Sequence, residues 1–177
     1  GTLNFMRSRA CSAISIALMQ NKEPVLGLIY DPYRDEMFTA LKGKGAYLNG
    51  TQIHASDMPF ERAMVSVGTS PYYAELADRT MAIALDFLKQ GGDLRRTGSA
   101  ALDLCDIACG RLDVFYELKL SPWDFCAGAL IILEAGGRFE LPVNGKAGAR
   151  NYGVPGFMLA ANQKCFDKAL EIINAHK

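Results

Sequence analysis

Asp124 is the residue of this 177-residue chain that is most clearly suited to a chemical role, and it lies in the segment Ser121-Pro122-Trp123-Asp124. The segment predicts the start of a helix, with Ser121 as the N-cap and Pro122 in the first turn. An acid at the third helical position can complete a capping box and favours the positive helix end. The same carboxylate can instead bind a divalent cation such as Mg²⁺, which prefers carboxylate oxygens. Because one carboxylate holds such an ion only weakly, this second interpretation requires partner acids.

A second acid, Glu117, lies seven residues before Asp124, at the end of a strand predicted over residues 112–116. A carboxylate at the edge of a cleft can accept hydrogen bonds from the hydroxyl groups of a polyol. The alternative is an ordinary exposed glutamate, because most glutamates lie on protein surfaces.

The chain opens with Gly1-Thr2, which could bind an anionic group. A glycine permits close approach to the backbone, and amides at the start of a short helix can bind an anionic oxygen. On composition alone, the same two residues are only the start of a loop.

The segment Thr97-Gly98-Ser99-Ala100 joins a predicted strand to a predicted helix. Open α/β sheets bind ligands at such strand-to-helix turns. A tight turn with Ser99 as the helix N-cap explains the same residues without a ligand.

The first part of the chain predicts an antiparallel meander over residues 11–53. Ile14, Ile16 and Leu18 alternate with small residues, which gives one apolar and one small face. Asn49-Gly50 favours a type I′ hairpin turn, because both of its central residues need positive φ. Strands are expected over residues 14–18, 25–30, 37–41, 47–48 and 51–53.

Beyond residue 60 strands and helices alternate, which predicts an α/β layer. The boundary suggests the remainder of an antiparallel domain over residues 1–60 and an α/β domain over residues 61–177. Strands are expected over residues 64–68, 94–97, 112–116 and 157–161, helices over 73–89, 99–108, 122–135 and 164–175, and a loop over 142–156. The helix over 73–89 has helically spaced apolar residues at Leu76, Met81, Ala84, Leu85 and Leu88.

Composition excludes several classes of protein. The 19 basic and 19 acidic residues cancel, which gives no electrostatic case for binding nucleic acid or an anionic membrane. No apolar stretch approaches the roughly 20 residues that span a bilayer. Five scattered cysteines do not make a disulfide framework and predict buried thiols of a cytoplasmic protein. Sequence motifs for a serine hydrolase, a nucleotide-binding loop or a dinucleotide site are not present.

Taken together, these segments resemble the inositol monophosphatase family. The resemblance rests mainly on Gly1-Thr2-x-Asn4-Phe5 and Trp123-Asp124-x-x-Ala127-Gly128. It extends to Lys42-Gly43-Lys44-Gly45-Ala46, Asn49-Gly50, Thr97-Gly98-Ser99-Ala100-Ala101, Gly110-Arg111-x-Asp113, Glu117 and Glu134-Ala135-Gly136-Gly137. It implies the layered αβαβα sandwich of the sugar phosphatases, here with an incomplete N-terminal domain.

The resemblance implies Mg²⁺-dependent hydrolysis of a phosphate monoester of a polyol or sugar. In that case Asp124 binds metal, Thr2 orients the attacking water, and the backbone of Gly1 and Thr2 holds the phosphate. The alcohol part of the substrate is held by the remaining predicted site residues, Gly98, Ser99, Ala100 and Glu117. The family carries further metal-binding acids upstream of the position of Gly1, so we expect the 177-residue chain to be inactive alone.

Two alternatives remain open. Within the family, the substrate could be fructose-1,6-bisphosphate, a nucleotide 3′-phosphate or histidinol phosphate. As an alternative without enzyme activity, the chain could be a non-catalytic fragment or an interaction module of the same fold. A meander without upstream partners exposes apolar surface and sheet edges, so a homodimer or higher oligomer is also expected.

Overall fold

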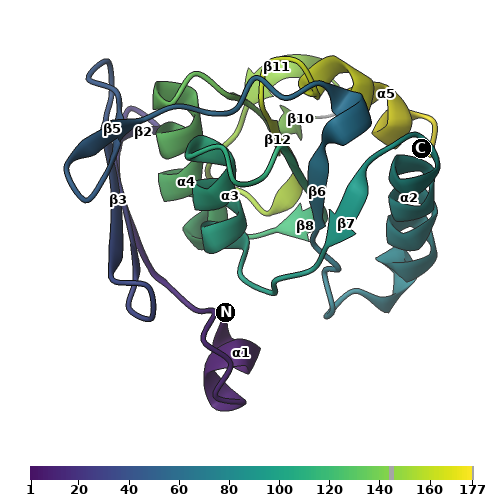
Figure 1. Cartoon of the computed structure of the whole chain (residues 1–177), viewed down its shortest axis with the longest axis horizontal. Helices are drawn as coiled ribbons and strands as arrows, with labels where there is room; N and C mark the ends of the chain where they lie inside the picture. Colours follow the sequence, from purple (N-terminus) through teal and green to yellow (C-terminus); the bar gives the residue numbers. More distant parts are fainter. Residues whose placement is uncertain (144–145, 177) are drawn as a thin grey trace.

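A computed structural model describes residues 1–143 and 146–176 as four stacked layers (Figure 1). An antiparallel sheet comes first, a helix pair second, a mixed sheet third and another helix pair fourth. The predicted α/β class is therefore confirmed, and the described residues supply the β, α, β and α layers of the predicted αβαβα sandwich. Among these residues, no helix is long and apolar enough to span a bilayer.

The first sheet is the predicted meander, with each strand antiparallel to the next in chain order. Its strands are β1 (Ile14–Gln20), β2 (Glu23–Asp31), β3 (Glu36–Leu41), β4 (Ala46–Leu48) and β5 (Thr51–Ile53). Asn49 and Gly50 join the last two strands with φ of 48° and 81°, as the hairpin prediction required.

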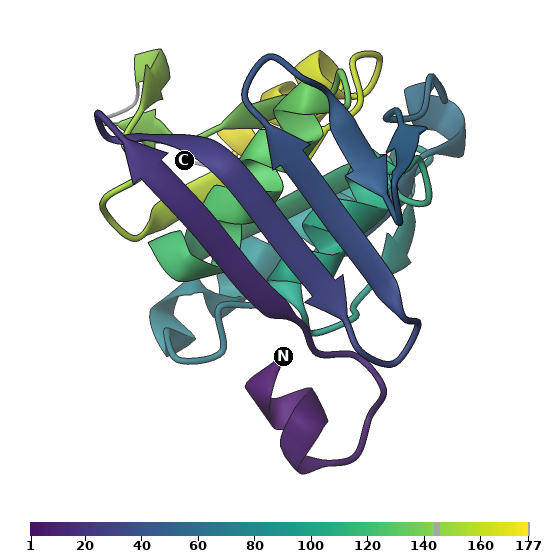
Figure 2. The same ribbon diagram turned by 90° about the vertical axis from the view of Figure 1, so that its left-hand side faces the viewer.

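Strand β1 of this sheet turns its small face inward, whereas β2 and β3 bury Ile29 and Phe38 on that side. Ala17 packs against the central core, whereas Ile14, Ile16 and Leu18 are 53–60% exposed. Figure 2 shows the outer face with no helix lying across it. The cause is the close approach of the helix layer, since a Cβ on Gly27 of β2 would lie 2.6 Å from the carbonyl oxygen of Ala127.

The second sheet has the strand order β7-β6-β8-β12-β9. Its first three strands are parallel and its last two pair antiparallel. The bounds are β7 (Asp93–Arg95), β6 (Met64–Val67), β8 (Val114–Leu120), β12 (Gly156–Ala161) and β9 (Arg138–Glu140).

The helices cover both faces of this sheet (Figure 1). Helices α3 (Ala100–Ala108) and α4 (Pro122–Glu134) lie between the two sheets and form one apolar core with them. Helices α2 (Ala77–Lys89) and α5 (Phe166–Asn174) cover the far face in a second core. Helix α1 (Thr2–Met6) lies apart from the layers, and short 3₁₀ turns occur at Phe60–Arg62 and Ala74–Leu76. Since the central core joins residues on both sides of position 60, the division into two domains stays a prediction.

The expected loop over residues 142–156 is wrong in part. Strands β10 (Pro142–Val143) and β11 (Lys146–Arg150) form a small antiparallel ribbon, β12 begins at Gly156, and positions 144–145 lie outside the described residues. Strand β9 was also not predicted. Glycine, proline and asparagine are uncommon in strands, so composition favoured a loop where tertiary pairing makes strands.

The predicted apolar face of α2 was also wrong. Ala84 is buried as predicted, but Met81, Leu85 and Leu88 are 50–61% exposed, and the helix buries Thr80, Ile83 and Phe87 in their place. The ring of Phe87 stacks on Tyr116 with centroids 5.4 Å apart and also contacts Phe60. Aromatic burial therefore rotates the helix away from the face that aliphatic spacing suggested.

Candidate active site

Helix α1 lies against the turn that precedes α3, although the two are more than 90 residues apart. The side-chain amide of Asn4 donates to the carbonyl oxygens of Thr97, at 3.0 Å, and Cys11, at 2.8 Å. Gly98 has a φ of 88°, and a Cβ there would lie 3.0 Å from the Asn4 amide nitrogen. Two of the predicted ligand-binding segments therefore meet, and Gly98 is needed for both its conformation and the close contact.

Asp124 lies in the first turn of α4 and is partly buried. Burial raises the pKa of its carboxyl, and a hydrogen bond from the Ser121 backbone lowers it in part. Ser121 is the N-cap residue, but its hydroxyl makes no capping hydrogen bond in the described part of the chain. Asp124 thus interacts with its own helix start and lies within electrostatic range of the backbone nitrogen of Gly1. Both interpretations from the sequence survive, and its role as a metal ligand stays a prediction.

Small residues one turn after Asp124 let α4 sit deep between its neighbours. A Cβ on Gly128 would lie 2.6 Å from a Leu104 methyl carbon of α3, and Ala127 meets Gly27 of β2 on the other side. The Ala-Gly part of the Trp-Asp-x-x-Ala-Gly segment therefore serves packing, which fixes the helix that carries Asp124. Sequence reasoning missed this role, although two adjacent small residues in a helix were a visible signal.

Glu117 is 7% exposed, so the alternative of an ordinary surface glutamate is wrong. Its carboxylate accepts hydrogen bonds from the Ser70 amide at 2.9 Å and the Ser70 hydroxyl at 3.3 Å. A Cβ on Gly68 would lie 2.3 Å from a Glu117 carboxylate oxygen, so only glycine fits there. Burial raises the pKa of Glu117, the Ser70 hydrogen bonds and Arg96 lower it, and the charge of Asp124 raises it. The two predicted acids are therefore close enough to interact electrostatically.

Ser99 is the N-cap residue of α3, as predicted, and is buried. Its hydroxyl makes no capping hydrogen bond among the described residues, and its backbone amide donates to the Thr97 hydroxyl at 3.2 Å. Ala100, the first residue of α3, is partly buried against the central core.

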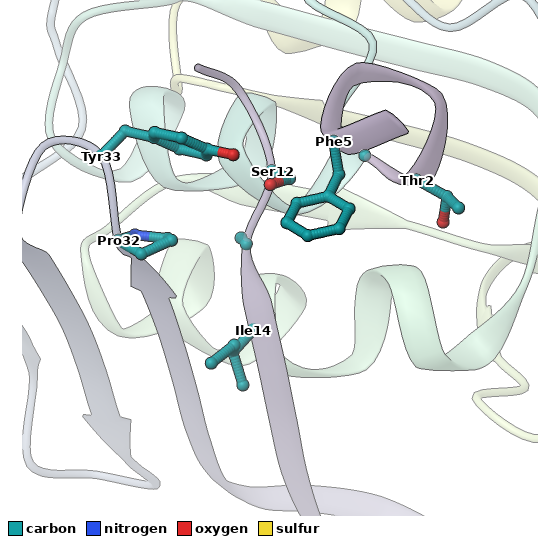
Figure 3. A pocket seen from close by; sticks show the side chains of 8 residues that line it. Thr2, Phe5, Ser12, Ile14, Pro32 and Tyr33 are labelled. Carbon is teal, nitrogen blue, oxygen red and sulfur yellow. The ribbon is translucent and has the colours of Figure 1, made fainter. Parts of the chain in front are cut away.

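Gly1 and Thr2 line a cavity of about 390 Å³ beside α1. Figure 3 shows Thr2 and Phe5 on the α1 side and Pro32 and Tyr33, from the β2–β3 turn, on the other. A Cβ on Gly1 would lie 2.7 Å from the Cα of Ser12, so this glycine is needed for packing. The described lining of the cavity does not include Gly98, Ser99, Ala100, Glu117 or Asp124.

Two of the other motif segments hold each other. The amides of Gly43 and Gly45 donate to the two carboxylate oxygens of Glu134 at 2.7 and 2.8 Å. The glycine-rich bend thus binds the end of α4, and its amides are engaged by a side chain of the protein. Sequence spacing gave no signal of this contact, since Glu134 is about 90 residues away.

Asp113, from the Gly110-Arg111-x-Asp113 segment, also has a structural role. It is 5% exposed and accepts from the Met64 amide at 2.8 Å, the Asn162 side chain at 3.1 Å, and the Ser56 hydroxyl. This carboxylate joins the start of β6 to Ser56, in the segment after β5, and to Asn162, directly after β12.

Further acids near the first sheet are held by arginines. Arg34 contacts Asp31 at 2.6 Å and Asp106 at 3.2 Å, and Arg111 contacts Glu36 at 2.6 Å. These ion pairs tie the β2–β3 turn to the end of α3.

The described residues do not form a complete metal site. Among them, no three His, Cys, Asp or Glu side chains lie close enough together to hold a metal ion. Asp124 remains a candidate for one ligand, and Glu117 already accepts two hydrogen bonds from Ser70. Since Mg²⁺ takes six oxygen ligands and keeps only some of them as waters, this donor set falls short of a firm site.

The family model of the inositol monophosphatase family matches residues 1–177. The chain belongs to this family. Members of the family are generally metal-dependent.

Individual relatives agree with this assignment. "Nus factor SuhB" from Escherichia coli K12 is 38% identical over 93% of this chain, and "Inositol monophosphatase 2" from Solanum lycopersicum is 45% identical over 77%. The structure of an inositol monophosphatase from Anabaena covers 100% of this chain and 69% of its own, with 31% identity and a TM-score of 0.86. The chain spans 60% of the E. coli relative, 53% of the tomato relative and 66% of a relative from Neisseria meningitidis.

Proposed function

We propose that this chain forms one wall of the active site of a Mg²⁺-dependent phosphatase that hydrolyses a phosphate monoester of a polyol or sugar. The observation that supports it is the hydrogen bond from Asn4 of α1 to the Thr97 carbonyl, which joins two of the segments predicted to bind the substrate, with Asp124 within electrostatic range of Gly1. Family membership supports a phosphatase reaction. The names of the tomato and Anabaena proteins favour an inositol monophosphate among the possible substrates.

Each predicted residue has a role in this proposal. When bound, Mg²⁺ would neutralise the charge that develops on the transferred phosphoryl group. Asp124 contributes one carboxylate toward it, and Thr2 orients the attacking water. The backbone of Gly1 and Thr2 holds phosphate oxygens.

The alcohol part of the substrate would contact the turn before α3 and Glu117, which lies in the middle of β8 and not at a strand end as the sequence predicted. The backbone from Gly98 to Ala100 and the carboxylate of Glu117 would hydrogen-bond its hydroxyl groups. Glu117 is fixed for this by Ser70 and by the absence of a side chain at Gly68. A nucleotide 3′-phosphate, fructose-1,6-bisphosphate or histidinol phosphate is the alternative substrate.

A phosphate-release assay tests this proposal. The chain alone should give little or no turnover and bind Mg²⁺ weakly, because its described residues hold no three-acid group. The chain extended upstream by the acid-bearing segments of the family should hydrolyse inositol 1-phosphate faster than the other esters. Preference for a nucleotide phosphate, or robust turnover by the 177-residue chain, would contradict the proposal.

The second candidate function is a binding role without catalysis. It is favoured by the incomplete acid set and by the name "Nus factor" of the E. coli relative. An extended chain that binds Mg²⁺ normally and still releases no phosphate from any ester would favour this candidate.

We further infer that the protein is a cytoplasmic homodimer that binds neither nucleic acid nor membrane. The five free cysteines suit a reducing compartment, and zero net charge disfavours polyanions. Apolar side chains at Leu3, Phe5, Met6 and Trp123 are 67–74% exposed, which favours association through this region. Sedimentation of a stable monomer at micromolar concentration would count against the dimer.

A further inference from the structure

Asp103, in the first turn of α3, is a carboxylate that the proposed reaction does not use. It is 2% exposed and accepts hydrogen bonds from two hydroxyl groups. Ser66, near the end of β6, donates at 2.9 Å, and Thr97 donates at 2.8 and 2.9 Å to its two oxygens. Burial of a carboxylate is costly unless hydrogen bonds within the protein replace the ones it made with water.

The hydrogen bonds continue from Asp103 into the turn. Above its pKa the Asp103 carboxylate is ionised and only accepts, so it then requires the Thr97 hydroxyl to donate to it. The lone pairs of that hydroxyl are then free to accept the Ser99 amide, which lies 3.2 Å away. From the other side, Asn4 donates to the Thr97 carbonyl at 3.0 Å. The turn is thus held both from the core and from α1.

The charged and titratable groups around Asp103 are few. Burial raises the pKa of Asp103 most, and the hydrogen bonds from Thr97 and Ser66 lower it; Asp106, one turn further along α3, raises it further, and Arg96, which precedes the turn, lowers it. The thiol of Cys11 also lies in its field, because Asp103 raises the pKa of that thiol. The carboxylate is therefore stabilised mainly by hydroxyl groups, and those hydroxyl groups are oriented in return.

We propose that Asp103 is a positioning residue, whose buried carboxylate fixes the Thr97 hydroxyl and through it the shape of the Thr97–Ser99 turn. This inference rests on the proposed function for its purpose, since that turn is the one assigned to the substrate alcohol. The geometry of the free protein is independent of any substrate.

The test is amide hydrogen exchange at Ser99, measured by NMR on the free chain. Thr97→Val keeps the shape of the side chain and removes the hydroxyl, and Thr97→Ser keeps the hydroxyl. Asp103→Ala removes the carboxylate. Ser66→Ala is the matched control, because Ser66 donates to the same carboxylate but makes no hydrogen bond with the turn among the described residues.

Exchange at Ser99 should be about tenfold faster in Thr97→Val, as expected for loss of one net hydrogen bond. In Thr97→Ser and Ser66→Ala the Ser99 exchange rate should stay near that of the unmutated chain. In Asp103→Ala, if it folds, the rate should match that of Thr97→Val. Unchanged Ser99 exchange in Thr97→Val, or in a folded Asp103→Ala, would overturn the inference.

The same spectra recorded with inositol 1-phosphate and Mg²⁺ separate the two proposals. Fast Ser99 exchange in Thr97→Val supports the positioning role even if no amide signal of the unmutated chain shifts when the ester is added. If no amide signal shifts in the unmutated chain extended upstream, that result counts only against the proposed substrate contact.

Discussion

Replacement of Gly27 by alanine tests the idea that the spacing of the first two layers is set by missing side chains. A Cβ at this position would lie 2.6 Å from the carbonyl oxygen and 3.2 Å from the Cα of Ala127. Both atoms belong to the backbone of α4, so rotation of a side chain cannot relieve the contact. The sheet or the helix would have to move.

The expected cost is large for a single methyl group. Overpacking a well-packed core costs about 1–3 kcal/mol, and a backbone-to-backbone clash belongs at the upper end. Part of this is offset because alanine lowers the entropy of the unfolded chain by about 0.4–1 kcal/mol relative to glycine. A net loss of about 2 kcal/mol corresponds to a fall in Tm of about 4–8 °C for a domain of this size.

Urea denaturation followed by circular dichroism measures this loss, with Gly156→Ala as the control. Gly156 is also a strand glycine, but a Cβ there would meet nothing within 4 Å. It should be neutral or slightly stabilising. Equal stability of Gly27→Ala and Gly156→Ala would refute the claim that a glycine sets the layer spacing.

Three further predictions concern single carboxylates. Glu134→Ala leaves the amides of Gly43 and Gly45 without their charged acceptor and should cost about 1–3 kcal/mol in urea denaturation, while Glu134→Gln, which keeps one acceptor oxygen, should cost less. Asp124→Asn, made in the chain extended upstream, should cut phosphate release by at least about tenfold and leave the urea midpoint nearly unchanged; retained activity would reduce Asp124 to a helix-capping residue. Burial raises the pKa of Asp103 to about 7 from an ordinary value of 3.8, so the folded state holds a proton that the unfolded state has lost, and stability should fall as pH rises from about 4 to about 7. Asp103→Asn has no such proton, and a urea midpoint that falls just as steeply with pH in this variant would contradict that origin.

Features set by neighbouring residues were predictable from the sequence. The hairpin at Asn49-Gly50 follows from the positive φ of both residues, and the start of α4 follows from Pro122 in its first turn. The meander was found because strand alternation and turn residues are local signals. The helix bounds over 100–108 and 122–134 came close for the same reason.

Features set by distant residues were not predictable. The apolar face of β1 points outward because Gly27 and Ala127 bring α4 against the small face, and no local pattern announces that choice. Strand β9 exists because it pairs with β12, some twenty residues later. For the site, sequence reasoning named Glu117 and Asp124 but missed the packing roles of Gly68, Ala127 and Gly128, which appear only once the layers are stacked.

The junction between Glu134 and the glycine-rich bend has a consequence for how this part of the sequence can change. Because the Glu134 carboxylate accepts hydrogen bonds from main-chain N–H groups, the exposed Lys42 and Lys44 can be replaced by other residues with little effect on the junction. The ion pair between Lys42 and Glu23 is solvent-exposed and contributes little. A one-residue insertion or deletion in the bend would instead displace both amides from the carboxylate at once. The junction at the far end of α4, about 15 Å from Asp124 along the helix, therefore tolerates substitution of the side chains in the bend and resists changes in the length of the bend.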